Sequence, residues 1–280
     1  MLQSDYRQYP SYPQGWSIHL FLGFIGGSIG AILVPAFLEQ EYSAISFLLL
    51  AASQFREVRN VERSTLKAME ETEMVPRGTG YIEGIARTFE ARNYLSIWVA
   101  LVMSASAEGL AAFGWPRHVL SILAGVVSAI ILNRLMRGGQ IKDIARVELA
   151  PIVFDGALLI VEETVIMNVA LAEARAVYTE RGLAAAIRPN GPNDKATLAN
   201  LGQMQAIAHD VAAMVGVFMD VGEQQFSPLV RRNPASGDLY LVLIPSEPNE
   251  TAFMAAVERV PVLESAVRKP LTSRAGQMMD

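Results

Sequence analysis

The side chains of this sequence that could bind a metal or move a proton are few and widely separated. The three histidines, His19, His118 and His209, lie in different parts of the chain, so we do not expect a shared metal site. The chain has no cysteine, which excludes disulfides, thiolate metal ligands and a cysteine nucleophile. We therefore predict no bound metal and no other cofactor.

Four polar residues fall close together in a segment with helical apolar spacing, residues 196–217. They are Gln203, Gln205, His209 and Asp210. Gln205 and His209 are one helical turn apart, but the second ligand pair of an H-E-x-x-H motif is missing. The sequence favours a polar helix face, or an interface with the membrane part, over a metal or catalytic site. No nucleophile elbow, Walker loop or dinucleotide fingerprint is present, so we predict that the protein is not an enzyme.

Glu108 interrupts an apolar stretch at residues 94–115. A carboxylate inside a membrane span is costly and should face a partner or a water-filled cavity. Ser104 lies one helical turn before it, and His19 is a candidate partner from another apolar stretch. The alternative is that Glu108 lies near the outer membrane surface and is solvated.

Four apolar stretches predict an α-helical transmembrane bundle of about four spans, at residues 17–38, 42–55, 94–115 and 119–136. The first is the clearest, because a span needs about 20 apolar residues. The second is short and could instead be a re-entrant or interfacial segment. Two small-residue pairs, Gly23 with Gly27 and Gly26 with Gly30, permit close helix approach in lipid. They indicate packing within the bundle, with homo-oligomerisation as the alternative.

The distribution of basic residues supports the count of four. Lys and Arg concentrate in residues 56–92 and 134–146, whereas the link at 39–41 has none. Basic residues accumulate on the cytoplasmic side, and four spans place both basic segments and both termini there. Three spans would leave one basic segment outside. We therefore predict a multi-pass protein of the cell membrane.

Composition separates a membrane part from a second part. The chain is 51% hydrophobic and 18% charged, whereas soluble domains average about 25% charged residues. We assign residues 1–146 to a transmembrane domain with a cytoplasmic helical hairpin. Residues 147–268 are a cytoplasmic α+β domain, and 269–280 a disordered tail. The second half is acidic, which argues against nucleic acid as a partner.

The second half has the turn and period signals of an α+β domain. Asp155-Gly156 is a hairpin turn signal between two short apolar runs. We predict helices at 165–181, 196–217 and 251–260. A strand is expected at 183–187, and a second hairpin joins 226–231 to 239–244.

One hexapeptide, Tyr81-Ile82-Glu83-Gly84-Ile85-Ala86, stands with Arg87 just before the third apolar stretch. Pro76 and Gly78 end the preceding helix, so these residues begin a new one in which Glu83 and Arg87 can pair. Ile82, Ile85 and Phe89 share one face. This location predicts an element that couples the membrane part to the acidic domain.

The run from Arg77 to Tyr94 resembles the signature of the YIEGIA family, integral-membrane proteins of endospore-forming bacteria named for the six residues. The segments Leu201-Gly202-Gln203 and Pro261 to Ala266 look similar too. The resemblance implies a membrane protein of spore formers, in the forespore or spore envelope, and a complex with a small capping-type subunit. It supplies no catalytic residues.

Two functions are therefore expected from different classes. The first is a non-enzymatic component of a membrane complex, in the lipid bilayer, whose cytoplasmic domain docks a small partner subunit. The alternative is an oligomeric ion channel or transporter gated by that domain. In the second case Glu108 and nearby serines would line the path.

Overall fold

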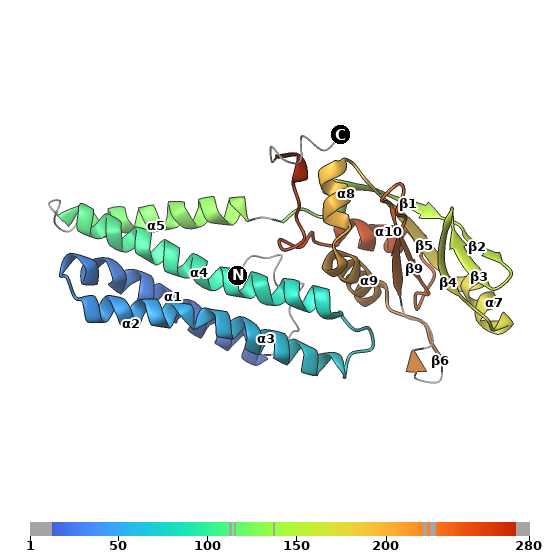
Figure 1. The fold of residues 1–280 in the computed structure, drawn as a ribbon, viewed down its shortest axis with the longest axis horizontal. Coiled ribbons are helices and arrows are strands. Elements are labelled where there is room, and N and C mark those ends of the chain that lie inside the picture. The colour runs from blue at the N-terminus through green and yellow to red at the C-terminus, as the bar shows by residue number, and fades with distance from the viewer. Residues whose placement is uncertain are drawn as a thin grey trace. The chain divides into compact units, whose positions relative to one another are not determined.

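The computed structural model describes residues 13–111, 114, 116–136, 138–220, 223–224 and 228–272 (Figure 1). The chain divides into two compact units. The first unit contains Met1–Thr65 and Ile85–Arg137, and the second contains Leu66–Gly84 and Gly138–Asp280. This division differs from the boundary at residue 146, because 66–84 and 138–146 belong to the second unit. The first 12 residues, and 273–280 of the predicted disordered tail, lie outside the described residues, while Pro270–Thr272 form a short 3₁₀ turn, η3.

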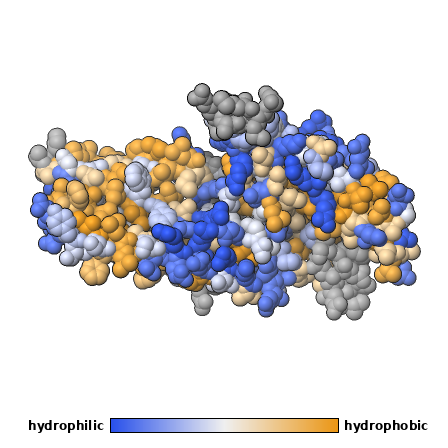
Figure 2. Space-filling model, in the orientation of Figure 1, coloured by the Kyte–Doolittle hydropathy of each residue, from blue (hydrophilic) through white to orange (hydrophobic). Residues whose placement is uncertain are grey.

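The first unit is built from helices. They are α1 (Pro13–Leu38), α2 (Tyr42–Ser53), the first part of α3 (Phe55–Glu70), most of α4 (Thr79–Gly109) and α5 (Pro116–Leu135). Apolar side chains cover much of the outside of this unit, as the orange surface of Figure 2 shows. Many of them are exposed, for example Phe24 and Ile131.

Helices α1 and α4 approach each other closely at two glycines. A Cβ atom at Gly26 would lie 3.1 Å from the carbonyl oxygen of Asn93, and one at Gly30 would lie 2.9 Å from the amide nitrogen of Leu101. Gly23 and Gly27 have no such neighbour within 4 Å. One predicted glycine pair thus packs within the unit, and the other lies on an open face.

The predicted bundle of four spans is wrong. In the part of the chain that the structure describes, two helices are long and apolar enough to cross a membrane, Trp16–Leu38 and Pro116–Leu135. Helix α2 has 12 residues and rises about 18 Å, whereas the hydrocarbon layer is about 30 Å thick. The predicted span at 94–115 is the second half of α4, which begins at Thr79 with charged turns and ends at Gly109. The apolar part of that helix is therefore too short to meet the same criterion.

The second unit has the predicted α+β class. Its elements are α6 (Ile141–Ile144), β1 (Ala145–Ala150), β2 (Ile152–Asp155), β3 (Leu158–Val161), β4 (Thr164–Asn168), α7 (Ala172–Arg181), β5 (Leu183–Pro189), α8 (Pro192–Leu198), α9 (Leu201–Val215), β6 (Met219–Asp220), β7 (Glu223–Gln224), β8 (Leu229–Arg232), β9 (Leu239–Leu243) and α10 (Glu250–Arg259).

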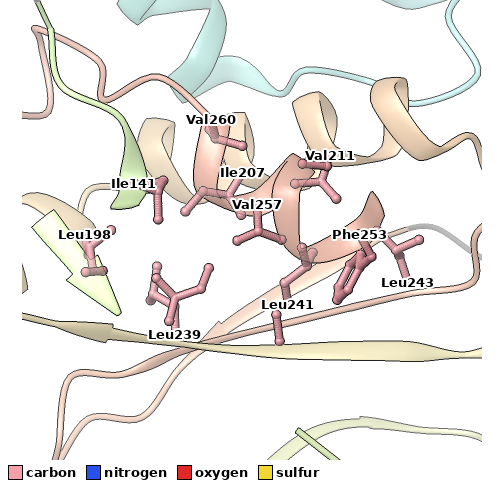
Figure 3. Close-up of a cluster of buried hydrophobic side chains, with 14 of the residues drawn as sticks. Ile141, Leu198, Ile207, Val211, Leu239, Leu241, Leu243, Phe253, Val257 and Val260 are labelled. Atoms are coloured by element: carbon pink, nitrogen blue, oxygen red, sulfur yellow. The ribbon is translucent and has the colours of Figure 1, made fainter. Parts of the chain in front are cut away.

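A four-stranded antiparallel sheet of order β1-β5-β9-β8 is the central layer of this unit. Successive residues of β9 point to opposite faces. Leu239, Leu241 and Leu243 pack with α9 and α10 on one side, where Figure 3 shows Ile207, Val211, Phe253 and Val257 facing them. On the other face, Tyr240 and Val242 join a core formed by the smaller sheet β2-β3-β4 and by α7. The sheet thus holds α9 against one layer of apolar side chains and leaves its opposite surface for other contacts.

Candidate functional site

The hexapeptide begins within the first turns of α4, and its start is fixed by a side chain of α9. The Oε1 atom of Gln205 accepts hydrogen bonds from the amide nitrogens of Gly80 and Tyr81, at 2.8 and 3.1 Å. The first N–H groups of a helix have no partner inside the helix. Gln205, which lies 125 residues after Gly80, therefore caps the start of α4. Tyr81 and Ile82 are fully buried.

The ring of Tyr81 reaches two further residues of α9. Its hydroxyl donates to the Oδ1 atom of Asp210 over 2.9 Å, in a buried environment. The imidazole of His209 lies edge-on to the Tyr81 ring, with 5.9 Å between ring centroids. Burial, and then the negative charge of Asp210, raise the pKa of Tyr81 well above its ordinary value. The phenol is therefore a permanent hydrogen-bond donor.

His209 fixes the loop that precedes α4. Its Nδ1 atom lies 2.8 Å from the carbonyl oxygen of Val75. Because a carbonyl can only accept, Nδ1 carries the proton in this contact. Burial, followed by the positive charge of Arg77, lowers the pKa of His209. The ring is thus held neutral as a structural donor.

Glycines allow the two backbones to approach. A Cβ atom at Gly80 would lie 2.9 Å from the amide nitrogen of Gly202, and one at Gly202 would lie 2.6 Å from the carbonyl oxygen of Gly80. Gly84 is similarly close to Ser265, whose hydroxyl oxygen would lie 2.9 Å from an added Cβ. Larger residues at these positions would push the start of α4 away from α9 and from Ser265.

Gln203 ties α9 to the segment after α10. Its side-chain amide donates to the carbonyl oxygen of Pro261 at 3.1 Å and accepts from the amide nitrogen of Leu263 at 2.8 Å. Gln203 is fully buried. The three segments that resemble the family signature, around residues 80, 202 and 263, therefore meet at one place. We call these contacts of residues 75–84 with α9 and with residues 261–265 the hexapeptide joint.

The four polar residues predicted from the sequence are thus brought together, and their side chains bind backbone groups and Tyr81. The rest of the motif, Ile85, Ala86 and Arg87, continues α4 in the first unit. Ile85 and Ala86 are buried and Arg87 is exposed. Sequence reasoning missed Val75 and Glu70, although Gly78 gave a signal. Its φ of +83° is a left-handed conformation that favours glycine, and its N–H donates to the carboxylate of Glu70.

The three intramembrane candidates do not form one site. Ser104 donates to the carbonyl oxygen of Ala31 at 2.7 Å and so joins α4 to α1. His19 packs edge-on against Phe89. Glu108 is exposed near the end of α4, about 28 Å along the helix axis from Phe89 at about 1.5 Å per residue. His19 is therefore not the partner of Glu108.

A second polar cluster, centred on Arg188 of β5, escaped the sequence analysis. Its guanidinium contacts three carboxylates, Glu148 at 2.9 Å, Asp238 at 3.1 Å and Glu162 at 2.5 Å. The hydroxyl of Tyr240 donates to Glu162 at 2.8 Å. Burial and this bond raise the pKa of Tyr240 to about 12. The cluster links both sheets. Its contacts are those of an ion-pair network with a structural role.

The geometry favours a structural role for these residues over a reaction centre. Within the described ranges, no three His, Asp or Glu side chains are grouped so as to hold a metal ion. The polar atoms of the hexapeptide joint make contacts inside the second unit, and they fix a helix start to an α+β domain. The residues named in this arrangement include no exposed nucleophile paired with a base.

Comparison with known proteins gives a family and a relative. The family model described as YIEGIA protein matches residues 1–273 of the chain. A protein of Bacillus subtilis (strain 168), described as uncharacterized protein YphB, is 40% identical over 270 residues, which cover 96% of this chain and 89% of the relative. No solved structure matches the chain.

Proposed function

The chain belongs to the YIEGIA family, and on that premise we propose that it is a non-enzymatic component of a membrane complex in spore-forming bacteria. In this proposal the helices of the first unit anchor the protein in the cell membrane or a spore membrane. The second unit lies on the cytoplasmic side and docks a small protein subunit. The occurrence of a relative in Bacillus subtilis supports the bacterial lineage.

The surface of the helical unit supports the membrane part of the proposal. In the most apolar windows of α1 and α5, only 22% and 11% of the residues are buried within the protein. The core helix of a water-soluble protein would bury most of its apolar residues. Apolar helices that expose this much surface need lipid or partner helices around them. We therefore propose that both helices are embedded in the bilayer.

The single observation that carries the proposal is the hexapeptide joint. The signature residues Tyr81 and Ile82 are fully buried in the second unit, and the helix that they begin continues through Ile85 into the first unit. Because the polar groups of the motif bond to other groups of the same protein, the motif holds a helix in place and does not take part in a reaction. We infer that it couples the anchored helices to the domain that binds the partner.

The test is purification of the tagged full-length chain from sporulating cells, in detergent, with identification of co-purifying proteins. The proposal expects one small protein to co-purify reproducibly with the wild type and in reduced amount with Gly80→Ala, because that variant separates α4 from α9. If no reproducible partner is found, the proposal is wrong. Ion flux in liposomes that Glu108→Ala abolishes would instead favour the channel alternative.

A further inference from the structure

Helices α4 and α5 run side by side in the first unit (Figure 1), and a groove of about 420 Å³ lies between them. Small side chains leave this space open, namely Ser96 and Ala100 on α4 and Ala129 on α5. The volume falls within the range of about 300–1,000 Å³ for ligand sites. The groove is therefore large enough to hold part of a small molecule.

The two ends of the groove differ in polarity. One end is lined by Arg92 of α4 and Asn133 of α5. At the other end the helices meet closely, because a Cβ atom added at Gly125 would overlap the side chain of Met103. The side chains between the ends are aliphatic apart from Ser96, whose hydroxyl donates to the backbone of α4. A molecule that fills the groove must be polar at one end and apolar along the rest.

The length of the groove matches one leaflet of a bilayer. From Arg92 to Met103, α4 rises about 17 Å at about 1.5 Å per residue. Half of a hydrocarbon layer of about 30 Å is about 15 Å. The polar end is also the end at which α4 leaves the second unit, at Ile85, and at which α5 leads back to it, at Gly138. These features place the polar end at the headgroups and the apolar end in the hydrocarbon.

Positive charge is in excess at the polar end. Arg134, the residue after Asn133, is exposed and forms no ion pair with any residue that the structure describes. Helix α5 contains no Asp or Glu. Glu90, the carboxylate nearest to Arg92 along α4, pairs instead with Arg59 at 3.5 Å. Basic side chains at the membrane surface attract anionic lipids, so the charge of this end complements a lipid phosphate.

We propose that this groove binds an anionic phospholipid of the cytoplasmic leaflet. One acyl chain lies along Ala129 toward Met103, and the side chains of Arg92 and Asn133 donate hydrogen bonds to the phosphate. The inference rests on the proposed function, because it requires the first unit to be embedded in the bilayer. It goes beyond the proposed complex, since it assigns a class of lipid to that unit.

The inference is tested with the purified full-length chain, stripped of lipid in detergent. The probes are palmitoyl-oleoyl phosphatidylglycerol, which is anionic, and palmitoyl-oleoyl phosphatidylcholine, which has the same acyl chains and no net charge. Native mass spectrometry measures the lipid bound, and the melting temperature is measured in parallel. We expect phosphatidylglycerol to bind about tenfold more tightly than phosphatidylcholine and to raise the melting temperature with its concentration.

Arg92→Gln tests the phosphate contact. It should remove the preference for phosphatidylglycerol, whereas Arg92→Lys keeps the charge and should retain most of it. Arg117→Gln is the matched control, because it removes an arginine from the opposite end of α5 and should leave the preference unchanged. Equal binding of the two lipids by the wild type, or the same preference in Arg92→Gln as in the wild type, would overturn the inference.

Two measurements locate the acyl chain. Ala129→Trp fills the groove from an exposed position and should weaken the binding of both lipids, whereas Ala105→Trp, at an exposed position of α4 outside the groove, should not. Phosphatidylglycerol with a photoactivatable diazirine on its acyl chain should attach to Val99, Met103 or Ala129 of the wild type. Adducts on other faces of the helices alone would refute the groove without depending on the folding of any variant.

The groove and the proposed complex can fail separately. Equal binding of the two lipids, in a protein that retains a reproducible partner, would overturn the groove and leave the complex standing. A preference for phosphatidylglycerol that Arg92→Gln removes, in a protein with no co-purifying partner, would support the groove and contradict the complex.

Discussion

At the scale of single residues, the hydroxyl of Tyr81 is the most informative atom of the joint. It donates to Asp210 in a buried environment, so Tyr81→Phe removes one hydrogen bond to a carboxylate while keeping the ring. The loss should destabilise the second unit by about 1–3 kcal/mol. Thermal or urea unfolding of the detergent-solubilised chain measures this change. Tyr42→Phe is the matched control because Tyr42 is 71% exposed; an equal loss in both variants would contradict a specific role for Tyr81.

His209 should give the second unit a pH dependence. Burial lowers its pKa below the ordinary value of 6.5 in the folded state, so between the two pKa values the unfolded state binds more protons than the folded state. Stability therefore rises with pH through this range, is complete above about 6.5 and is lost as the solution becomes more acidic. Melting temperatures measured from pH 7.5 down to pH 5 should show the decline.

His209→Gln should flatten that profile, because glutamine can still donate to the carbonyl of Val75 but does not titrate. His118→Gln is the control, since His118 is exposed, and it should keep the wild-type slope. A His209→Gln profile with the full wild-type slope would assign the pH dependence to other groups.

At the scale of secondary-structure elements, the close approach of α4 and α9 depends on glycine. A Cβ atom at Gly80 would lie 2.9 Å from the backbone nitrogen of Gly202, and backbone cannot move away as a flexible side chain can. Gly80→Ala should therefore cost about 1–3 kcal/mol of stability, as overpacking does. Gly23→Ala meets no atom within 4 Å and should not destabilise, since alanine favours the helix by about 1 kcal/mol. Unfolding midpoints of the two variants decide the point, and equal midpoints would refute the close packing.

Elements with strong local signals were predictable, and those set by distant contacts were not. The Asp155-Gly156 turn predicted the β2–β3 hairpin, because Gly156 adopts a positive φ. By contrast, 165–168 were predicted as helix but form β4, since pairing with β3 overrides local propensity. The helix that starts at Thr79 was foreseen from Pro76 and Gly78. Its continuation through Tyr94 without a break was not, and one of the two extra spans was placed there.

The residues of the candidate site could be predicted from the sequence, but the contacts that they make could not. The polar residues of α9 stood out in the sequence, yet nothing local shows that Gln205 caps a helix that begins at Thr79. Likewise, Gln203 gives no local sign of its bonds to Pro261 and Leu263. Contacts between residues so far apart in the chain depend on the packing of the whole unit around the central sheet.

At the scale of the whole molecule, the division into two units restricts which segments can lie on opposite sides of a membrane. Residues 66–84 and the chain from Gly138 onward form one compact unit, so any membrane that holds α1 and α5 must leave both segments on the same side. The absence of cysteine allows this to be tested with single introduced cysteines. Glu71 and Ser236 are exposed representatives of the two segments.

A membrane-impermeant maleimide should treat Glu71→Cys and Ser236→Cys alike. With the second unit in the cytoplasm, both should be protected in intact protoplasts and labelled after lysis. Opposite labelling of Glu71→Cys and Ser236→Cys would contradict a second unit that contains both segments, and it would also contradict the hexapeptide joint.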